Sequence, residues 1–323
     1  MKILVTGCAG FIGFHLCLKL LKNKNLKIFG IDNLNNYYDK KLKLLRLSII
    51  KKNKNFYFTK LDIRKKNLLS NDFKKNNYDY VIHLAAQAGV RYSIENPTTY
   101  FENNLEGFFN ILDNSRLRNV KHFLFASTSS VYGNNKKFPL KEDFKTEEPL
   151  SFYAATKKSN EVIAYSYSNI FNMPCTALRF FTAYGPYGRP DMSLFKFTKL
   201  ITENKKIDLF NSGNHIRDFT YVDDIVRFIH KLIKKPSSKK IPYDVFNLAS
   251  GSPNKLVKFL DVLEENLNIK SKKNNLSLQK GDVFKTHADI KKIIIKTGIK
   301  PNVDINKGIK NFVKWYKMYK NIK

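Results

Sequence analysis

The sequence predicts an α/β protein built on a doubly wound parallel sheet, with a smaller C-terminal α/β region that covers one edge of the sheet. Short runs of β-branched and aromatic residues alternate with longer helical patterns over the first 180 residues. A glycine-rich turn directly follows the first of these runs. Beyond residue 180 the alternation breaks at Pro186, Gly188 and Pro190, which indicates a change of architecture.

Seven runs are predicted as strands because each is short, mainly apolar and followed by a turn or a helical pattern. These runs span residues 2–6, 27–32, 56–61, 80–85, 122–126, 175–179 and 245–248. The stretches 11–22, 104–118 and 151–171 have the longer periodicity of helices. We therefore expect one domain at 1–180, to which the strand at 245–248 returns, and a second domain formed mainly by 181–323. Residues 236–240 and 271–275 are predicted as flexible insertions.

Composition excludes several classes of protein. The chain has 323 residues, of which 43% are hydrophobic and 14% aromatic, enough to form a substantial core. Its three cysteines, Cys8, Cys17 and Cys175, form no C-x-x-C pair, so neither a disulfide framework nor a cysteine-built metal site is expected. This cysteine usage predicts a reducing, cytoplasmic compartment. No apolar run approaches the ~20 residues that span a bilayer, and no signal-peptide pattern precedes the first strand, so no membrane partner is expected.

The formal net charge of +31 comes mostly from lysines, because only nine of the 58 basic residues are arginines. The lysines are scattered along the whole chain and often stand beside asparagine. Nucleic-acid binding is more typical of arginine-rich clusters interleaved with stacking aromatics on one element. The charge therefore predicts a lysine-rich surface that attracts anionic substrates, with no nucleic-acid partner.

The turn after the first strand has the spacing of a dinucleotide-binding loop. Gly7, Gly10 and Gly13 form a G-x-x-G-x-x-G motif that opens a helix, whose N-terminal N–H groups are available to phosphates. Asp32 ends the second strand, 19 residues beyond Gly13, where an acid accepts hydrogen bonds from ribose hydroxyls. Asp62 follows the third strand, where it could contact adenine. Because Asp32 repels a 2′-phosphate, the motif predicts a Rossmann-type domain that binds NAD rather than NADP.

A candidate acid–base pair occupies the helix predicted at 151–171. Tyr153 and Lys157 are four residues apart and share one helix face. A free phenol titrates near pH 10, and a cation within about 4–6 Å lowers that pKa by a unit or more. The hydroxyl cluster Ser127-Thr128-Ser129-Ser130 ends the fifth strand, at the sheet edge where ligands bind in open α/β folds.

With these motifs, the chain resembles the extended short-chain dehydrogenase/reductase enzymes that act on nucleotide sugars, over essentially all its length. Within that group it looks most like the UDP-glucuronate 4-epimerases. The stretches that carry the closer resemblance are DNLNNYYD at 32–39, HLAAQAGVRYS at 83–93 and RFFTAYGPYGRPDM at 179–192.

The resemblance implies a role for each matching residue. Tyr153 is similar to the base that takes the sugar O4 proton, Thr128 to the hydroxyl that bonds that oxygen, and Lys157 to the lysine that lowers the phenol pKa. The cofactor residues implied are Gly7, Gly10, Phe11, Ile12, Gly13, Asp32, Asn33, Asp62, Ile63, Ala85 and Lys157. The substrate residues implied are Arg91, Asn104, Ser127, Ser129, Thr182, Arg189, Phe197 and Arg217. Among them, Asn104 is similar to the asparagine that braces the site, and Phe197 has a place in the core of the second domain as its alternative. Many relatives also carry an arginine just before Gly281-Asp282; this chain has Gln279 and Lys280 there, so no role is assigned.

The reaction implied is NAD-dependent 4-epimerisation of a UDP-sugar through a transient 4-keto intermediate, and UDP-glucuronate to UDP-galacturonate fits best. Relatives that dehydrate or decarboxylate carry a carboxylate at position 129 or 130, where this chain has Ser129 and Ser130. Arg189 is the first choice for holding the sugar carboxylate, with a structural role in its loop as the alternative. Epimerisation of UDP-glucose or a UDP-N-acetylhexosamine, decarboxylation of UDP-glucuronate, and a non-catalytic NAD-sensing or nucleic-acid-binding role remain alternatives.

The resemblance also implies a homodimer and a role in polysaccharide biosynthesis. Such a dimer forms through two helices per subunit, here those that follow the fourth and fifth strands.

Overall fold

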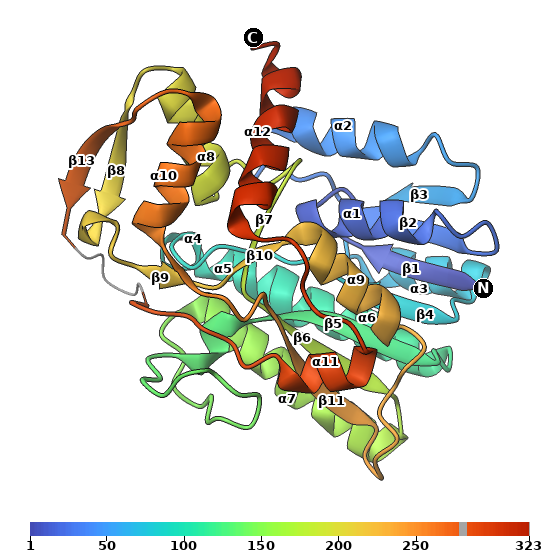
Figure 1. Cartoon of the computed structure of the whole chain (residues 1–323). Coiled ribbons are helices and arrows are strands. Elements are labelled where there is room, and N and C mark those ends of the chain that lie inside the picture. Colours follow the sequence, from blue (N-terminus) through green and yellow to red (C-terminus); the bar gives the residue numbers. More distant parts are fainter. Residues whose placement is uncertain (278–282, 323) are drawn as a thin grey trace.

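The computed structural model describes residues 1–277 and 283–322 (Figure 1). A seven-stranded sheet forms its centre, in the order β11-β6-β5-β4-β1-β2-β3, and every neighbouring pair is parallel. The strands are β1 (Lys2–Thr6), β2 (Lys27–Asp32), β3 (Phe56–Lys60), β4 (Tyr80–His83), β5 (His122–Thr128), β6 (Cys175–Phe180) and β11 (Tyr243–Leu248). The predicted fold class and all seven predicted strands are confirmed. The strand order reverses beside β1, which opens a crevice at the carboxyl ends of β1 and β4.

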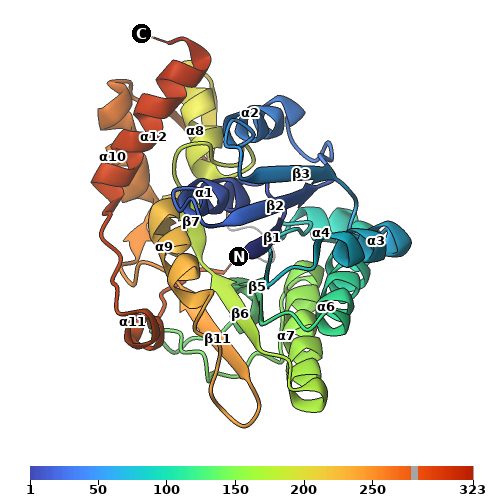
Figure 2. The same ribbon diagram turned by 90° about the vertical axis from the view of Figure 1, so that its right-hand side faces the viewer.

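Helices cover both faces of this sheet (Figure 2). The sheet helices are α1 (Phe11–Leu20), α2 (Lys40–Ile50), α3 (Lys66–Asn76), α4 (Tyr92–Glu95), α5 (Pro97–Tyr100), α6 (Gly107–Leu117), α7 (Phe152–Phe171), α9 (Val222–Leu232) and α11 (Lys291–Thr297). A π-helical turn at Phe101–Glu106 leads into α6, and a 3-10 turn at Ser129–Tyr132 follows β5. No helix in these two ranges combines the length and apolar character needed to span a membrane.

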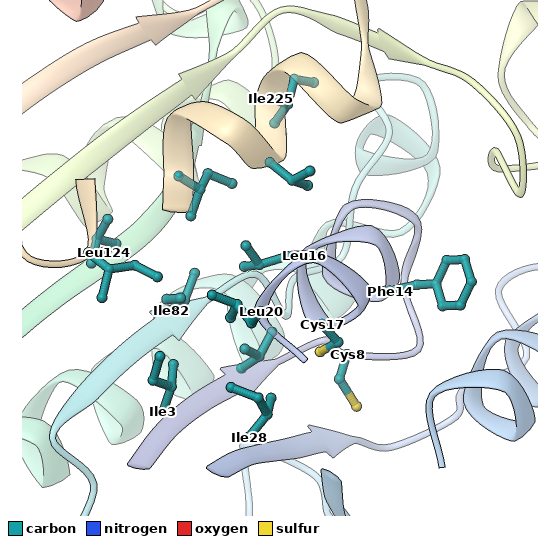
Figure 3. Packing of buried hydrophobic residues seen from close by; sticks show 14 of the residues in the cluster. Ile3, Cys8, Phe14, Leu16, Cys17, Leu20, Ile28, Ile82, Leu124 and Ile225 are labelled. Atoms are coloured by element: carbon teal, nitrogen blue, oxygen red, sulfur yellow. The ribbon is translucent and has the colours of Figure 1, made fainter. Parts of the chain in front are cut away.

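Successive strand residues face opposite sides, so the sheet has two apolar faces. Ile3 and Val5 pack with α1 and α9, whereas Leu4 packs with α3 and α6. Figure 3 shows the first of these cores, a cluster that includes Leu16 and Leu20 of α1 and Ile225 of α9. Because both faces are covered, the strands are nearly continuous apolar runs, which is why the sequence identifies them well.

A second hydrophobic core lies beside the sheet, among aromatic residues of the C-terminal half. Its helices are α8 (Ser193–Thr202), α10 (Leu256–Leu267) and α12 (Ile305–Lys320). Three short strand pairs accompany them: β7 (Thr182–Tyr184) with β10 (Phe219–Tyr221), β8 (Lys206–Phe210) with β13 (Lys272–Leu276), and β9 (Ile216–Arg217) with β12 (Asn254–Lys255). A 3-10 turn at Asn211–Gly213 follows β8.

Two features of the C-terminal half differ from the sequence prediction. Residues 272–275, predicted as a flexible insertion, lie within β13, whose polar side chains are exposed beside β8. The return to the sheet is also larger than one strand: α9 packs on α1, and α11 packs on β11 and α9. The sequence missed both because a polar edge strand lacks apolar alternation, and a helix alone does not indicate which core it joins.

Candidate active site

A cavity of about 430 Å³ opens at the carboxyl ends of six neighbouring strands, from β6 to β3 in the order of the sheet. The glycine loop after β1, Asp32 at the end of β2, Ala85 after β4, Thr128 at the end of β5 and Phe180 at the end of β6 all line it. These segments meet because parallel strands end at one sheet edge. Tyr153 and Lys157 of α7 also line the cavity, as does Arg189, which lies between β7 and α8.

The glycine loop can be made only by glycine. Gly7 has φ +70°, and a Cβ on it would lie 2.8 Å from the backbone nitrogen of Ala85. A Cβ on Gly13 would lie 2.2 Å from the carbonyl oxygen of Gly7, and one on Gly10 would lie 2.9 Å from the same oxygen. No side chain caps the N-terminus of α1 at Gly10, so its N–H groups are available to a bound anion. This cradle fits the diphosphate of a dinucleotide.

Asp32 is held at the adjoining wall of the cavity. Its carboxylate accepts hydrogen bonds from the backbone N–H of Ala9 at 3.1 Å and of Leu34 at 2.8 Å. Burial raises its pKa, and the nearby Lys43 ammonium acts in the opposite direction. The side chain therefore lies where an acid can accept from ribose hydroxyls, and Asn33 lines the cavity next to it.

Lys43 is a cavity residue that the sequence analysis missed. Its ammonium donates to the carbonyl oxygen of Asn35 at 2.9 Å and lies 4.7 Å from the centre of the Tyr38 ring. The sequence feature that could have identified Lys43 is its position on the helix, because Lys43, Arg46 and Leu47 share the buried face of α2. Among so many lysines, that feature did not distinguish Lys43.

The third strand contributes a different kind of wall. Leu61 and Ile63, which follow β3, line the cavity, whereas Asp62 between them is not among its lining residues. Burial acts to raise the pKa of Asp62, but hydrogen bonds from Arg64 and Asn33 lower it to about 2. The Asp62 carboxylate accepts from Nε of Arg64 at 3.0 Å and from Nδ2 of Asn33 at 3.1 Å. Asp62 is thus an ionised, rigidly held acceptor beside Ile63.

The Tyr153–Lys157 pair is placed by the start of α7. Ser151 caps this helix by accepting a hydrogen bond from the backbone N–H of Ala154 at 3.1 Å, so Tyr153 lies in the first turn. Lys157 is 2% exposed, and its Nζ donates to the carbonyl oxygen of Ala126 at 3.0 Å. Burial lowers the pKa of Lys157 to about 7.

Tyr153 reaches the cavity from the same helix face. Burial raises the pKa of its phenol, whereas a hydrogen bond with Thr128 and the positive charge of Arg189 act to lower it. Thr128 is itself held by Ser130, whose backbone N–H donates to its hydroxyl at 3.2 Å. The sequence analysis assigned the lowering effect to Lys157; here Thr128 and Arg189 oppose the rise, and the effect of Lys157 stays a prediction.

Arg189 extends over the cavity beside Tyr37. Its Nε donates to Asp191 at 3.1 Å, and the guanidinium lies 5.9 Å from the centre of the Tyr37 ring. Burial acts to lower its pKa, but the Asp191 carboxylate holds that pKa above the usual value. Thr182 lies on the same wall, and Ser129 on the wall formed after β5.

Several predicted substrate residues do not face the cavity. Phe197 is 6% exposed and belongs to the second hydrophobic core, because it lies on the buried face of α8. Arg217 donates to the carbonyl oxygens of Ile216 and Phe284, each at 3.0 Å, and Arg91 lies 5.1 Å from the centre of the Phe210 ring. The Phe197 side chain therefore takes the core position that was its alternative, its contact with substrate stays a prediction, and neither arginine lines the described cavity.

Asn104 and Ser127 support the cavity rather than reach into it. The Asn104 side chain accepts from the backbone N–H of Gln87 at 2.8 Å and donates to Thr156 at 3.1 Å. The Ser127 hydroxyl donates to Glu161 at 2.6 Å, although the residue contributes to the cavity wall. Asn104 therefore braces the loop after β4 against α7, in line with the bracing role that the resemblance implies, and a contact with substrate stays a prediction. Gln279, Lys280, Gly281 and Asp282 lie outside the described residues.

A doubly wound sheet with a glycine cradle, an acid after β2 and a Tyr–Lys pair at its carboxyl edge defines an enzyme of the short-chain dehydrogenase/reductase type. The model of the NAD dependent epimerase/dehydratase family matches residues 3–249. The chain belongs to this family and is an NAD-dependent enzyme.

Two relatives and two solved structures are similar to nearly the whole chain. Protein CapI of Staphylococcus aureus is 47% identical, with 99% of both chains covered. UDP-glucuronate 4-epimerase 4 of Arabidopsis thaliana is 43% identical over 99% of this chain and 76% of its own length. UDP-glucuronic acid 4-epimerase from Bacillus cereus, solved with UDP-glucuronic acid and NAD, has a TM-score of 0.92 at 34% identity, covering 99% of this chain and 100% of its own. UDP-glucose 4-epimerase from Thermotoga maritima, solved with UDP-glucose, has a TM-score of 0.87 at 30% identity, with 99% of both chains covered.

Proposed function

We propose that this enzyme interconverts UDP-glucuronate and UDP-galacturonate by NAD-dependent 4-epimerisation. The observation that carries the proposal is one cavity lined by Tyr153, Lys157, Thr128 and Arg189 beside a dinucleotide cradle. The similarity to named UDP-glucuronate 4-epimerases over almost the whole chain supports the same substrate.

The proposed mechanism uses one proton acceptor twice. Tyr153 takes the proton of the sugar O4 as the C4–H bond breaks, and the sugar becomes a 4-ketone. When bound in the cradle, NAD⁺ supplies a reversible acceptor for the C4 hydride. Thr128 hydrogen-bonds O4 and shares its proton, while Lys157 holds positive charge beside the phenol. With NAD bound in the cradle, the ketone would rotate within the cavity so that the hydride would return to the opposite face of C4, and Tyr153 would give the proton back to O4.

The hydroxyls at the end of β5 favour epimerisation over other fates of the ketone. Ser129 and Ser130 both line the cavity, where dehydration or decarboxylation would call for a carboxylate acid or base. Their hydroxyl groups have pKa values far too high for that work at neutral pH. This residue pair therefore favours a 4-epimerase over a UDP-glucuronate decarboxylase.

A 4-keto glucuronate is a β-keto acid and loses CO₂ readily, so the enzyme must hold its carboxylate. Arg189 and Thr182 are the cavity residues that suit this role, since charge-assisted hydrogen bonds are strong and directional. We predict that Arg189→Ala lowers kcat/KM for UDP-glucuronate by ~10²-fold, in line with the loss of a charged contact, and releases some CO₂. Analysis of the products by NMR checks this; an unchanged product profile contradicts the role of Arg189.

A 4-epimerase of neutral UDP-hexoses is the second candidate, because such enzymes are also structurally similar. The discriminating feature is Arg189, whose cation serves a carboxylate and has no charged partner on a neutral hexose. Turnover of UDP-glucose that exceeds turnover of UDP-glucuronate would favour this second function.

A homodimer is proposed through the helices that follow β4 and β5. Apolar side chains are exposed along this pair: Phe101 and Phe109 at 56% and 41%, and Val162, Tyr165 and Ile170 of α7 at 57%, 47% and 65%. The two helices lie side by side on one face of the sheet (Figure 2). A second copy of this chain covers these side chains and completes a four-helix interface.

The cellular setting follows from the same proposal. Three buried free thiols suit a reducing cytoplasm. UDP-galacturonate is an activated sugar, so glycosyl transfer into a polysaccharide is its expected use.

The deciding experiment is incubation of the purified protein with UDP-glucuronate, without added NAD, followed by NMR of the sugar. We expect UDP-galacturonate, no CO₂ and no net change in NADH absorbance. A UDP-pentose with stoichiometric CO₂ would establish decarboxylation instead. Tight, salt-sensitive binding of RNA or DNA without turnover of any nucleotide sugar would favour the non-catalytic alternative.

A further inference from the structure

Arg46 on α2 is a completely buried arginine whose hydrogen bonds are all made to carbonyl oxygens and one phenol. Its exposure is 0%, and burial lowers its pKa from the usual value. An arginine has five N–H donors on three nitrogen atoms, and each of the three nitrogens of Arg46 donates at least one hydrogen bond. Nη1 donates to the carbonyl oxygen of Ala9 at 3.0 Å and to the Tyr38 hydroxyl at 2.6 Å.

The other side of the same guanidinium holds a distant segment. Nε and Nη2 donate to the carbonyl oxygen of Tyr187, at 3.1 and 2.6 Å, and Nη2 also donates to that of Gly188 at 3.1 Å. Ala9 lies inside the glycine loop, whereas Tyr187 and Gly188 directly precede Arg189 in the sequence. One side chain therefore joins the cofactor cradle to the segment that carries Arg189.

The segment 186–188 needs such external support. Tyr187 has φ +56°, a left-handed conformation that a non-glycine residue keeps only when its surroundings impose it. Pro186 has its carbonyl oxygen bound by Nε2 of His15, on α1, at 2.9 Å. Three successive carbonyls before Arg189 are thus held by side chains from α1 and α2, the helices beside the glycine loop. The Tyr187 ring packs on Phe14 and Trp315 with centroids 4.9 Å apart in each case.

We propose that Arg46 is a positioning residue that sets the place of Arg189 relative to the glycine loop, and so determines the selectivity for an acidic sugar. This inference rests on the proposed function. Arg46 does not line the cavity, so it acts on substrate only through the turn at 186–188.

The guanidinium shape is essential to this role. Its planar fork donates in several directions at once, whereas a lysine ammonium is a single point on a flexible stem. Arg46→Lys therefore keeps the positive charge but cannot hold Ala9 and the Tyr187–Gly188 carbonyls together. Arg227→Lys is the matched control, since Arg227 lies on α9 and donates to Asp224 away from the cavity.

The test is a double-mutant cycle with the full-length protein, measuring kcat and KM for UDP-glucuronate and UDP-glucose. We expect Arg46→Lys to lower kcat/KM for UDP-glucuronate by ~10²-fold, as expected from a small misplacement of a substrate-holding group, while the value for UDP-glucose changes by less than about threefold. The effects of Arg46→Lys and Arg189→Ala should be non-additive, with the double variant no worse than Arg189→Ala. Additive losses, or equal losses on both substrates, would overturn the proposal.

Two further measurements keep the test decisive. If Arg46→Lys does not fold, His15→Leu removes a donor from the same turn, and His15→Gln, which retains an N–H donor, should recover the selectivity that His15→Leu loses. If the unmodified protein is inactive on UDP-glucuronate, the proposed function fails, but the positioning role is still tested by a crystal structure of Arg46→Lys. An unmoved turn at 186–189 in that structure would reject the role of Arg46 independently of the substrate.

Discussion

At the scale of single residues, the candidate site depends on how burial changes acid–base chemistry. Lys157 is buried and Tyr153 is half-buried at the cavity wall, and desolvation disfavours the charged form of each. The phenol is therefore a poor acid by itself, and the lysine, with a pKa of about 7, is partly protonated at neutral pH, so a fraction of it carries the positive charge beside the phenol.

Tyr153→Phe should retain NAD and lose turnover, since the phenol oxygen is the group proposed to accept the O4 proton. We expect kcat to fall by ~10³-fold or more, the size of contribution that general acid–base groups make. Single-turnover assays with UDP-glucuronate, together with NAD quantified after denaturation, measure both effects. Near-normal turnover would show that another group is the base.

Lys157→Met should stabilise the cofactor-free protein at low pH while it abolishes activity. The folded pKa of Lys157 is about 7, against 10.5 for the ordinary side chain. Between pH 7 and pH 10.5 the unfolded chain therefore binds more protons at Lys157 than the folded chain does, so the free energy of unfolding rises with pH over this range. Below pH 7 the buried amine lowers the free energy of unfolding by its full amount. Urea unfolding at pH 6 and pH 9.5 should show the larger gain for Lys157→Met at pH 6. An equal gain at both pH values would contradict the shift.

At the scale of elements, the glycine loop and the start of α1 form one backbone unit. Gly13 packs so closely on Gly7 that the predicted spacing has a steric reason as well as a ligand-binding one. The sequence motif identified this unit because glycine requirements are local and leave a fixed spacing in the chain.

Gly13→Ala should weaken both NAD binding and stability, because the new Cβ would overlap the Gly7 carbonyl and force the loop open. An overpacked site of this kind costs about 1–3 kcal/mol of unfolding free energy. Thermal unfolding and NAD retention measure the two effects. Gly298→Asn is the control, since Gly298 ends α11 with φ +74° and no neighbour near its Cβ position. Full NAD retention by Gly13→Ala would contradict the cradle.

At the scale of the whole molecule, the C-terminal half contributes both to the second hydrophobic core and to the central sheet with its helices. The segment after β6 forms the second core, returns through α9, β11 and α11 to complete the sheet, and leaves Arg189 between the two. The cavity is therefore lined by both halves of the chain. The segment before Arg189 is held by side chains of α1 and α2, which belong to the sheet domain. The exposed apolar residues of the proposed dimer interface lie on the π-helical turn at 101–106, on α6 and on α7.

Val162→Asp should prevent dimerisation, because it places an unpaired charge in the centre of the proposed helix–helix interface. Light scattering after size exclusion should report a monomer at micromolar protein concentration. Ile295→Asp is the matched control: Ile295 is 84% exposed on α11, away from α6 and α7, and should leave the assembly unchanged. A dimer that survives Val162→Asp would place the interface elsewhere.

The sequence by itself determined the features that depend on neighbours in the chain. These are the seven strands, the helix predicted at 151–171, the glycine loop, and the shared helix face of Tyr153 and Lys157. Each leaves a local pattern, because strand alternation, helix phase and glycine requirements act over a few residues.

Only the tertiary structure decided which side chains meet across the molecule. It assigned Lys43 to the cavity wall, chose the core position for the Phe197 side chain, and supplied Gln87 and Thr156 as the partners that Asn104 braces. It also brought Arg46 to Ala9 and to Tyr187, which lie 37 and 141 residues away in the chain. The physical reason is that a side chain's partner depends on what the fold places opposite it, and such pairing leaves no periodic signal in one sequence.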